Sequence, residues 1–286
     1  MPNSIINNKK YTFSGHESFS CKSLWLRKGY DFVANSGDFN SADAVIALGV
    51  GKNMVASIRY WMRSFGMLKD GQLTPLAHYL FHPKSGRDVY TESLGTLWLL
   101  HFMIVHTQFA SLYRMIFLHY QKERKTFDKQ GLLNFVKRVM VEEGKSTIYN
   151  ENTVKKDIGV LLQNYIVPSR SKSYEDYSFL LIDLDLLRGD DNGTYKFNID
   201  GKRIIPEEIL LYAILKNKEQ DMTVSSTSLQ EIALIFCLTE AELLNEIQQI
   251  QAHYPDSIRY SDTAGIRQLQ FINEVDPIKV LDSYYQ

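Results

Sequence analysis

Apolar positions recur with a helical period on both sides of a glycine pair between Asn40 and Leu68. After the pair, one face of the chain is apolar, with Val55, Ile58, Met62 and Phe65 at steps of three, four and three. Gly49 and Gly51 allow a sharp turn because glycine adopts backbone conformations that other residues avoid. The pattern predicts a helix, a tight turn and a second helix. It is typical of helix-turn-helix DNA-binding units, and equally of helical hairpins with a purely structural role.

The opposite face of the second predicted helix carries polar and basic side chains. If this helix enters a major groove, the candidates for DNA contact on this face are Lys52, Asn53, Ser57, Tyr60 and Arg63. Lys52 and Asn53 begin the helix, where exposed backbone N–H groups and the positive end of the helix dipole favour phosphate. We therefore expect this helix to be the principal reading helix.

A second helix pair is expected between residues 128 and 168. Asn150 or Asn152 can cap its second helix by accepting a backbone N–H. Lys155 and Lys156 lie on that helix and are further candidates for DNA contact.

Two β-hairpins are expected after the later helix pairs. The first has strands at Ser178–Leu187 and Tyr195–Ile199, and the second has strands at Ser257–Tyr260 and Ile266–Ile272. A helix pair followed by a hairpin predicts a winged-helix-like module.

The last predicted helix of the chain differs from the earlier ones in charge. Thr239 and Glu242 have the spacing of a capping box that opens this helix. Glu240, Glu242 and Glu246 are expected on its outer face, where they would repel phosphate. We therefore expect this module to contact a protein partner rather than DNA.

The middle of the chain contains a long apolar helical pattern from Thr91 to His106. We interpret it as a helical hub that joins the modules. The expected fold is mainly α with short β-hairpins, built as two or three winged-helix-like helix-turn-helix modules around this hub. The expected domains are an N-terminal module at 1–85, the hub and second module at 86–200, and an acidic module at 201–286.

The near-neutral net charge of −1 hides an asymmetry along the 286 residues. Residues 1–160 contain 21 Lys and Arg against 13 Asp and Glu, a net of +8, whereas residues 161–286 contain 11 against 20, a net of −9. This distribution favours nucleic acid as a partner of the front half and a protein as a partner of the acidic C-terminal half. The alternative is that the two halves attract each other.

Composition favours a cytoplasmic protein. Cys21 and Cys237 are far apart and do not have metal-ligand spacing, which is typical of a reducing compartment. The N-terminal residues contain no apolar segment of the kind found in a secretory signal, and no apolar run is long enough to span a membrane. We expect no membrane partner.

No group of residues has the spacing of a known catalytic or metal site. His16 and Glu17 are adjacent, and adjacent side chains of an extended chain point to opposite faces, so a histidine that fastens the N-terminal segment is favoured over an acid/base pair. His78 and His82 lack a third metal ligand. We expect no enzyme activity, no metal and no cofactor. A metal-dependent nuclease remains an alternative because of four aspartates, Asp183, Asp185, Asp190 and Asp191.

Three blocks of sequence resemble one bacterial family. They are FSGHESF at Phe13–Phe19, CKSLWLRKGYDFV at Cys21–Val33 and LGVGKNMVASIRYW at Leu48–Trp61. The family is domain-of-unknown-function family 4007. The resemblance implies a place in phage-defence gene islands, beside genes for DNA phosphorothioate modification. It supplies no catalytic residues.

The sequence thus predicts a non-catalytic protein that binds nucleic acid, most simply duplex DNA, within a defence or DNA-modification assembly. The alternative from another class is a structural or adaptor subunit that uses its winged-helix-like modules for protein contacts.

Overall fold

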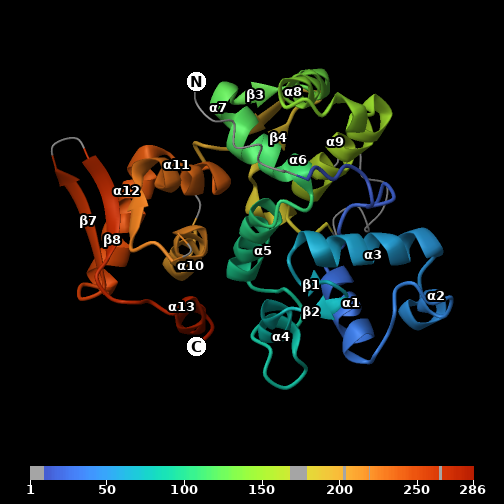
Figure 1. The fold of residues 1–286 in the computed structure, drawn as a ribbon, viewed down its shortest axis with the longest axis horizontal. Helices are drawn as coiled ribbons and strands as arrows, with labels where there is room; N and C mark the ends of the chain where they lie inside the picture. Colours follow the sequence, from blue (N-terminus) through green and yellow to red (C-terminus); the bar gives the residue numbers. More distant parts are fainter. Residues whose placement is uncertain (1–9, 168–178, 202–203, 219, 264–265) are drawn as a thin grey trace.

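The computed structural model describes residues 10–167, 179–201, 204–218, 220–263 and 266–286. Most of these residues are helical, and the strands form small antiparallel sheets (Figure 1). The helices of the first half are α1 (Trp25–Ala34), α2 (Ala44–Leu48), α3 (Lys52–Ser64), α4 (Pro75–Phe81), α5 (Leu94–His106), α6 (Ser111–Arg114), the π-helix η1 (Met115–Tyr120), α7 (Gln121–Glu123) and α8 (Lys129–Glu142). They are followed by the 3₁₀ turn η2 (Ser146–Ile148), α9 (Glu151–Tyr165), the 3₁₀ turn η4 (Ile182–Leu184), α10 (Glu207–Lys218), α11 (Ser226–Ile235), α12 (Glu240–His253) and α13 (Pro277–Tyr284). The mainly α class with short hairpins is therefore confirmed.

In the described part of the chain, the strands form one hairpin and two three-stranded sheets. The hairpin pairs β1 (Leu68–Lys69) with β2 (Gln72–Leu73). The second sheet has the order β3 (Thr126–Phe127), β5 (Tyr195–Phe197), β4 (Leu187–Gly189), and the third has the order β6 (Thr223–Ser225), β8 (Ile266–Phe271), β7 (Ile258–Thr263). In each three-stranded sheet, one strand precedes a helix pair in the chain and pairs with a strand of the hairpin that follows that helix pair. The sheet therefore links the chain segments before and after the helix pair.

Helix α5 is the hub of the molecule. All eleven residues from Gly95 to Val105 are buried, because this helix is apolar on every side and other elements surround it. In Figure 1 it lies between helices α1 and α3 on one side and helices α10 to α13 on the other. The expected helical hub is therefore present. Within the described residues, no helix is both long and apolar enough to cross a membrane.

The helix pair expected between Asn40 and Leu68 is present, with a shorter first helix. Helix α2 begins at Ala44, and Gly49 ends it in the left-handed conformation, with φ of 63°. Helix α3 begins at Lys52. The predicted apolar stripe is confirmed, because Val55, Ile58, Met62 and Phe65 are all buried.

The two later hairpins differ in how well they were predicted. Strand β8 lies where it was expected, whereas β7 extends three residues beyond the expected end at Tyr260, to Thr263; residues 264–265 are outside the described residues. The strand expected at Ser178–Leu187 is wrong in extent: Ser178 lies outside the described residues, and β4 begins only at Leu187. The segment before it forms η4, and Asp185 follows in the left-handed conformation. The alternation of leucine and aspartate there reflects a tight turn with buried leucines, not a strand.

Two predicted helix caps are confirmed, at α9 and at α12. Asn150 caps α9 by accepting the Thr153 N–H at 3.0 Å. Thr239 and Glu242 form the expected capping box at α12. One buried apolar cluster extends through the ranges 1–85, 86–200 and 201–286, so the three predicted units share a core.

Candidate nucleic-acid interface

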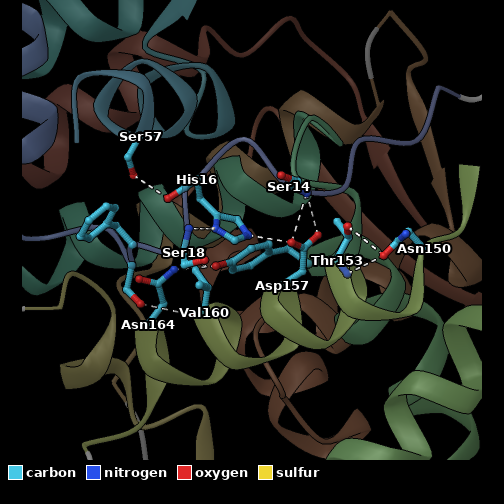
Figure 2. Close-up of polar contacts among 12 residues, drawn as sticks. Ser14, His16, Ser18, Ser57, Asn150, Thr153, Asp157, Val160 and Asn164 are labelled. Carbon is cyan, nitrogen blue, oxygen red and sulfur yellow. Dashed lines mark hydrogen bonds and ion pairs between the residues drawn. The ribbon is translucent and has the colours of Figure 1, made fainter. Parts of the chain in front are cut away.

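The segment Phe13–Phe19 lies between helices α3 and α9 and binds to both (Figures 1 and 2). His16 Nε2 lies 2.8 Å from Asp157 Oδ1, and both side chains are buried. The Ser14 N–H donates to both oxygens of Asp157, at 3.1 and 2.9 Å. The Asp157 carboxylate of α9 therefore binds the segment at two places, the Ser14 backbone N–H and the His16 ring.

The ring of His16 has a defined role in this contact. Its Nδ1 accepts the Ser18 N–H at 3.1 Å, so in the neutral ring the proton is on Nε2 and is donated to Asp157. Both ring nitrogens are then occupied, and Nδ1 has no free lone pair with which to accept a proton from a substrate. The prediction that His16 fastens the N-terminal segment through hydrogen bonds is confirmed.

Two predicted DNA-contact residues do not lie on an exposed face. Ser57 is fully buried, and its hydroxyl donates to the His16 carbonyl at 3.0 Å. Tyr60 is 7% exposed, and a Cβ added to Gly15 would lie 2.7 Å from its ring. The expectation of an exposed polar face at these two positions is therefore wrong, because the N-terminal segment covers this side of α3.

Burial also changes the acidity of groups near the segment. Desolvation raises the pKa of the Tyr60 hydroxyl, and the negative charge of Asp157 raises it further. Desolvation raises the pKa of the fully buried Cys21 thiol, as is typical of a structural cysteine. Both groups are neutral at physiological pH.

The remaining predicted contact residues are exposed and come from two helices. Lys52, Asn53 and Arg63 are exposed on α3, and Lys155 and Lys156 are exposed on α9. Their surroundings differ. Lys155 pairs with Glu151 at 2.6 Å, and the guanidinium of Arg63 lies 4.3 Å from the centre of the Phe109 ring.

A polar hollow of about 310 Å³ lies at the start of these two helices. It is lined by Ser14, His16, Glu17, Ser18, Asn53, Thr153, Lys156 and Asp157. The structure therefore brings together one predicted residue of each helix, Asn53 and Lys156, at the segment that contains His16. Lys52, Lys155 and Arg63 do not line this hollow.

The other candidates for chemistry do not converge. Within the described ranges, no three His, Cys, Asp or Glu side chains are placed to hold a metal ion. His78 bonds the Tyr30 hydroxyl, whereas His82 bonds Ser85. Asp185 pairs with Arg188, and Asp190 accepts backbone N–H groups within its own turn. These aspartates serve local turn structure.

The role of Asp157 in binding the N-terminal segment was not predicted from the sequence. Asp157 directly follows the two candidate lysines of α9, and the signal was a carboxylate at a position that the helical period places toward the core. A buried carboxylate needs partners, so this position requires N–H donors from elsewhere in the chain. The identity of those donors, 141 and 143 residues away, has no local signal.

Comparison with known proteins places the chain in a family. The model of the family described as "Protein of unknown function (DUF4007)" matches residues 13–285. The chain belongs to the DUF4007 family. No curated protein matches the chain.

Two solved structures have the same fold as this DUF4007 chain. One is described as "SspB crystal structure" and is 25% identical, with a TM-score of 0.82; the match covers 96% of this chain and 88% of that one. The other is described as "Magnesium ion-bound SspB crystal structure" and is 23% identical, with a TM-score of 0.82; the match covers 99% of this chain and 90% of that one.

Proposed function

We propose that this protein binds duplex DNA without catalysis, as a subunit of a bacterial defence or DNA-modification assembly. The place in such an assembly rests on the family resemblance. The DNA binding rests on the residues of α3 and α9.

The observation that carries the proposal is the meeting of Asn53 and Lys156 at one hollow, with Lys52 and Lys155 exposed beside them. Lys52 and Lys156 form no hydrogen bond or ion pair with another described residue, so their ammonium groups are available to phosphate. No described side chain caps the N-terminus of α3, so the backbone N–H groups of Lys52 and Asn53 have no acceptor within the helix.

The order of elements supports a winged-helix interpretation of the later modules. In the last third the chain runs α10, β6, α11, α12, β7, β8, and the sheet order is β6-β8-β7. The middle third runs through η1 and α7 to β3, α8, α9, β4 and β5, with the sheet order β3-β5-β4. In such units the helix before the hairpin is the one that enters a groove, and here this helix is α9 or α12.

The experiment is a fluorescence anisotropy titration of the full chain with a duplex and with single-stranded RNA, each at two salt concentrations. Binding through Lys and Arg releases counterions, so the logarithm of affinity for the duplex should fall with the logarithm of salt by about 0.9 for each phosphate contacted. A salt-independent affinity, or no binding at low salt, would contradict the proposal and favour the adaptor alternative.

The acidic composition of residues 161–286 supports the proposal of a second binding surface, for a protein partner. Residues 161–286 have a net charge of −9, which disfavours phosphate there. Removing residues 201–286 would expose the shared core, so the test is charge neutralisation of exposed acids in the full chain. A loss of partner capture with unchanged DNA affinity would support this surface.

A magnesium-dependent nuclease is the second candidate function, and it is favoured by one structural neighbour, the magnesium ion-bound SspB. The hollow contains two carboxylates, Glu17 and Asp157, and Mg²⁺ binds carboxylate oxygens. The fit is poor, because both oxygens of Asp157 already accept N–H bonds and Lys156 lies beside them. Nicking of a supercoiled plasmid with Mg²⁺, but not with EDTA, would replace the first candidate by this one.

A further inference from the structure

We propose that the hollow between α3 and α9 is the seat of a single backbone phosphodiester of the bound strand, held by Lys156 and Asn53 together. This inference rests on the proposed function and adds to it a position and a ligand chemistry. It makes the two helices parts of one site, whereas the sequence predicted one principal reading helix and further contact residues on a second helix.

The chemistry of the lining selects this ligand. All eight lining residues are polar, and no aliphatic side chain is among them. The ring of His16 is 4% exposed and is engaged at both nitrogens, so it offers no free face for stacking. A base needs such a face, whereas a phosphate needs N–H and O–H donors. The lining therefore suits the backbone of a strand and not its bases.

The donors of the hollow that remain available are the ones that phosphate requires. The ammonium of Lys156 and the amide of Asn53 have no partner among the described residues. Asp157 adds negative charge, but three N–H bonds from Ser14 and His16 already stabilise its oxygens. Glu17 is the remaining carboxylate of the lining, and its side chain is exposed.

The geometry of the site is fixed by the N-terminal segment. Ser14 and His16 bind α9, and the His16 carbonyl accepts the Ser57 hydroxyl of α3 at 3.0 Å. Cys21 N–H donates to Asn164 of α9 at 2.9 Å. Because one segment binds both helices, it holds the start of α3 beside the start of α9, and a ligand shared by Asn53 and Lys156 requires this arrangement.

Neighbouring lysines on α9 provide the test. Lys156→Ala removes a charge from the hollow, and Lys155→Ala removes the same charge one residue away, where it is paired with Glu151. In anisotropy titrations of the full chain with duplex, we expect Lys156→Ala to lower affinity about tenfold and to reduce the salt slope by about 0.9. Lys155→Ala should lower affinity by about twofold. Equal losses for the two variants would overturn the proposal while leaving DNA binding by charge intact.

The variant Glu17→Gln tests whether the ligand of the hollow is negatively or positively charged. If the hollow receives a phosphodiester, removing the carboxylate should raise duplex affinity about threefold, because a like charge near the ligand is lost. If the hollow receives a divalent cation, the same variant should lower affinity in MgCl₂ and have no effect in EDTA, and this result would overturn the proposal.

A separate probe keeps the inference testable if duplex binding itself fails. The dinucleotide dTpdT contains one phosphodiester, and its binding can be followed by amide chemical shifts of the full chain. Saturable shifts at Ser18, Asn53 and Lys156 in the wild type, reduced about tenfold in affinity by Lys156→Ala, would support the hollow without the duplex. No shifts at these residues would overturn it.

Discussion

The front helix α9 contains two lysines and two carboxylates, whereas the back helix α12 contains three glutamates and no lysine or arginine, and the two helices use their charges differently. On α9, Lys156 is exposed and forms no ion pair with a described residue. On α12, Glu240 pairs with Arg267, and Glu242 accepts the Thr239 N–H at 2.7 Å. The front helix therefore presents one unpaired charge, that of Lys156, to solvent, whereas the back helix uses most of its charge within the fold.

Glu246 completes this contrast. It was expected on the outer face of α12 with Glu240 and Glu242, but it is partly buried. Burial raises the pKa of Glu246, and the charges of Glu207 and Glu242 raise it further. The comparison teaches that net charge counted along the sequence differs from charge that a partner can contact. It weakens the expected repulsion of phosphate by α12 and leaves the partner of this module a prediction.

The largest effect that we predict concerns stability and the segment that joins α3 and α9. Asp157→Ala removes the acceptor of the buried His16 Nε2–H and of the Ser14 N–H. Breaking a buried pair by removing one partner costs roughly 3–5 kcal/mol, and we expect a loss of about 3 kcal/mol in the free energy of unfolding. Urea denaturation followed by circular dichroism measures it. The exposed neighbour Lys156→Ala is the control and should change stability by less than about 0.5 kcal/mol. Equal stability of the Asp157 variant and the wild type would mean that the segment is not fastened through this carboxylate.

The next effect concerns DNA affinity and addresses the front half of the comparison. Replacing Lys52 and Lys156 together by Ala should cost about 2 kcal/mol in binding free energy, or roughly 30-fold, because two phosphate contacts are lost. Lys69→Ala is the control, since it removes an exposed charge from β1. Glu240→Gln tests the back half and should leave duplex affinity unchanged, because its charge is paired with Arg267. A double variant that binds as well as the Lys69 control would make the front helices packing elements.

How far the sequence predicts this molecule depends on the range of the interactions involved. The stripe of α3, the turn at Gly49 and the capping box at Thr239 were all predicted, because each depends on neighbours within a few residues. The order of the hub helix and the hairpins along the chain was also predicted from local patterns, apart from the strand expected before Leu187.

The candidate site was predicted only in part, because it is made by contacts between distant residues. Periodicity placed Ser57 on the polar face of α3 correctly, but exposure was inferred from polarity alone. The segment that buries Ser57 lies 41 residues earlier, and the same segment meets Asp157 at a separation of 141 residues. Both separations are far longer than the three or four residues over which a helical period brings side chains together. Asn53 and Lys156 were each predicted, whereas their meeting at one hollow follows from the fold.

A smaller effect tests the local use of charge on α12. Thr239→Ala removes the hydroxyl that accepts the Glu242 N–H, and loss of such a cap costs about 1 kcal/mol. Thermal unfolding should show the loss. Thr239→Ser retains the hydroxyl and is the matched control, with stability close to that of the wild type. If the Ala and Ser variants are equally stable, Glu242 is not held in the capping box and its charge returns to the outer face.

The smallest effect that we predict concerns the pH dependence due to Glu246. Its pKa is raised in the folded chain by desolvation first and by Glu207 and Glu242 second, so the folded protein binds this proton more tightly than the unfolded chain does. A raised carboxyl pKa contributes stability that is fully present below the unfolded value, near about 4.3, and is lost as pH rises through the folded value. At pH 7 the charged side chain is therefore unfavourable in the fold. Glu246→Gln should be more stable than the wild type at pH 7, by about 0.5 kcal/mol or less because the group is partly solvated, and this advantage should vanish near pH 4.

Urea unfolding of the two proteins at these pH values measures the difference. Glu240→Gln is the control, since Glu240 is paired with Arg267 and its neutralisation should bring no gain at pH 7. A Glu246 variant that is less stable than the wild type at pH 7 would mean that this carboxylate has a favourable partner. The contrast between α9 and α12 would then have to be redrawn from the charges that each helix presents to solvent, because burial would no longer explain how the back helix uses Glu246.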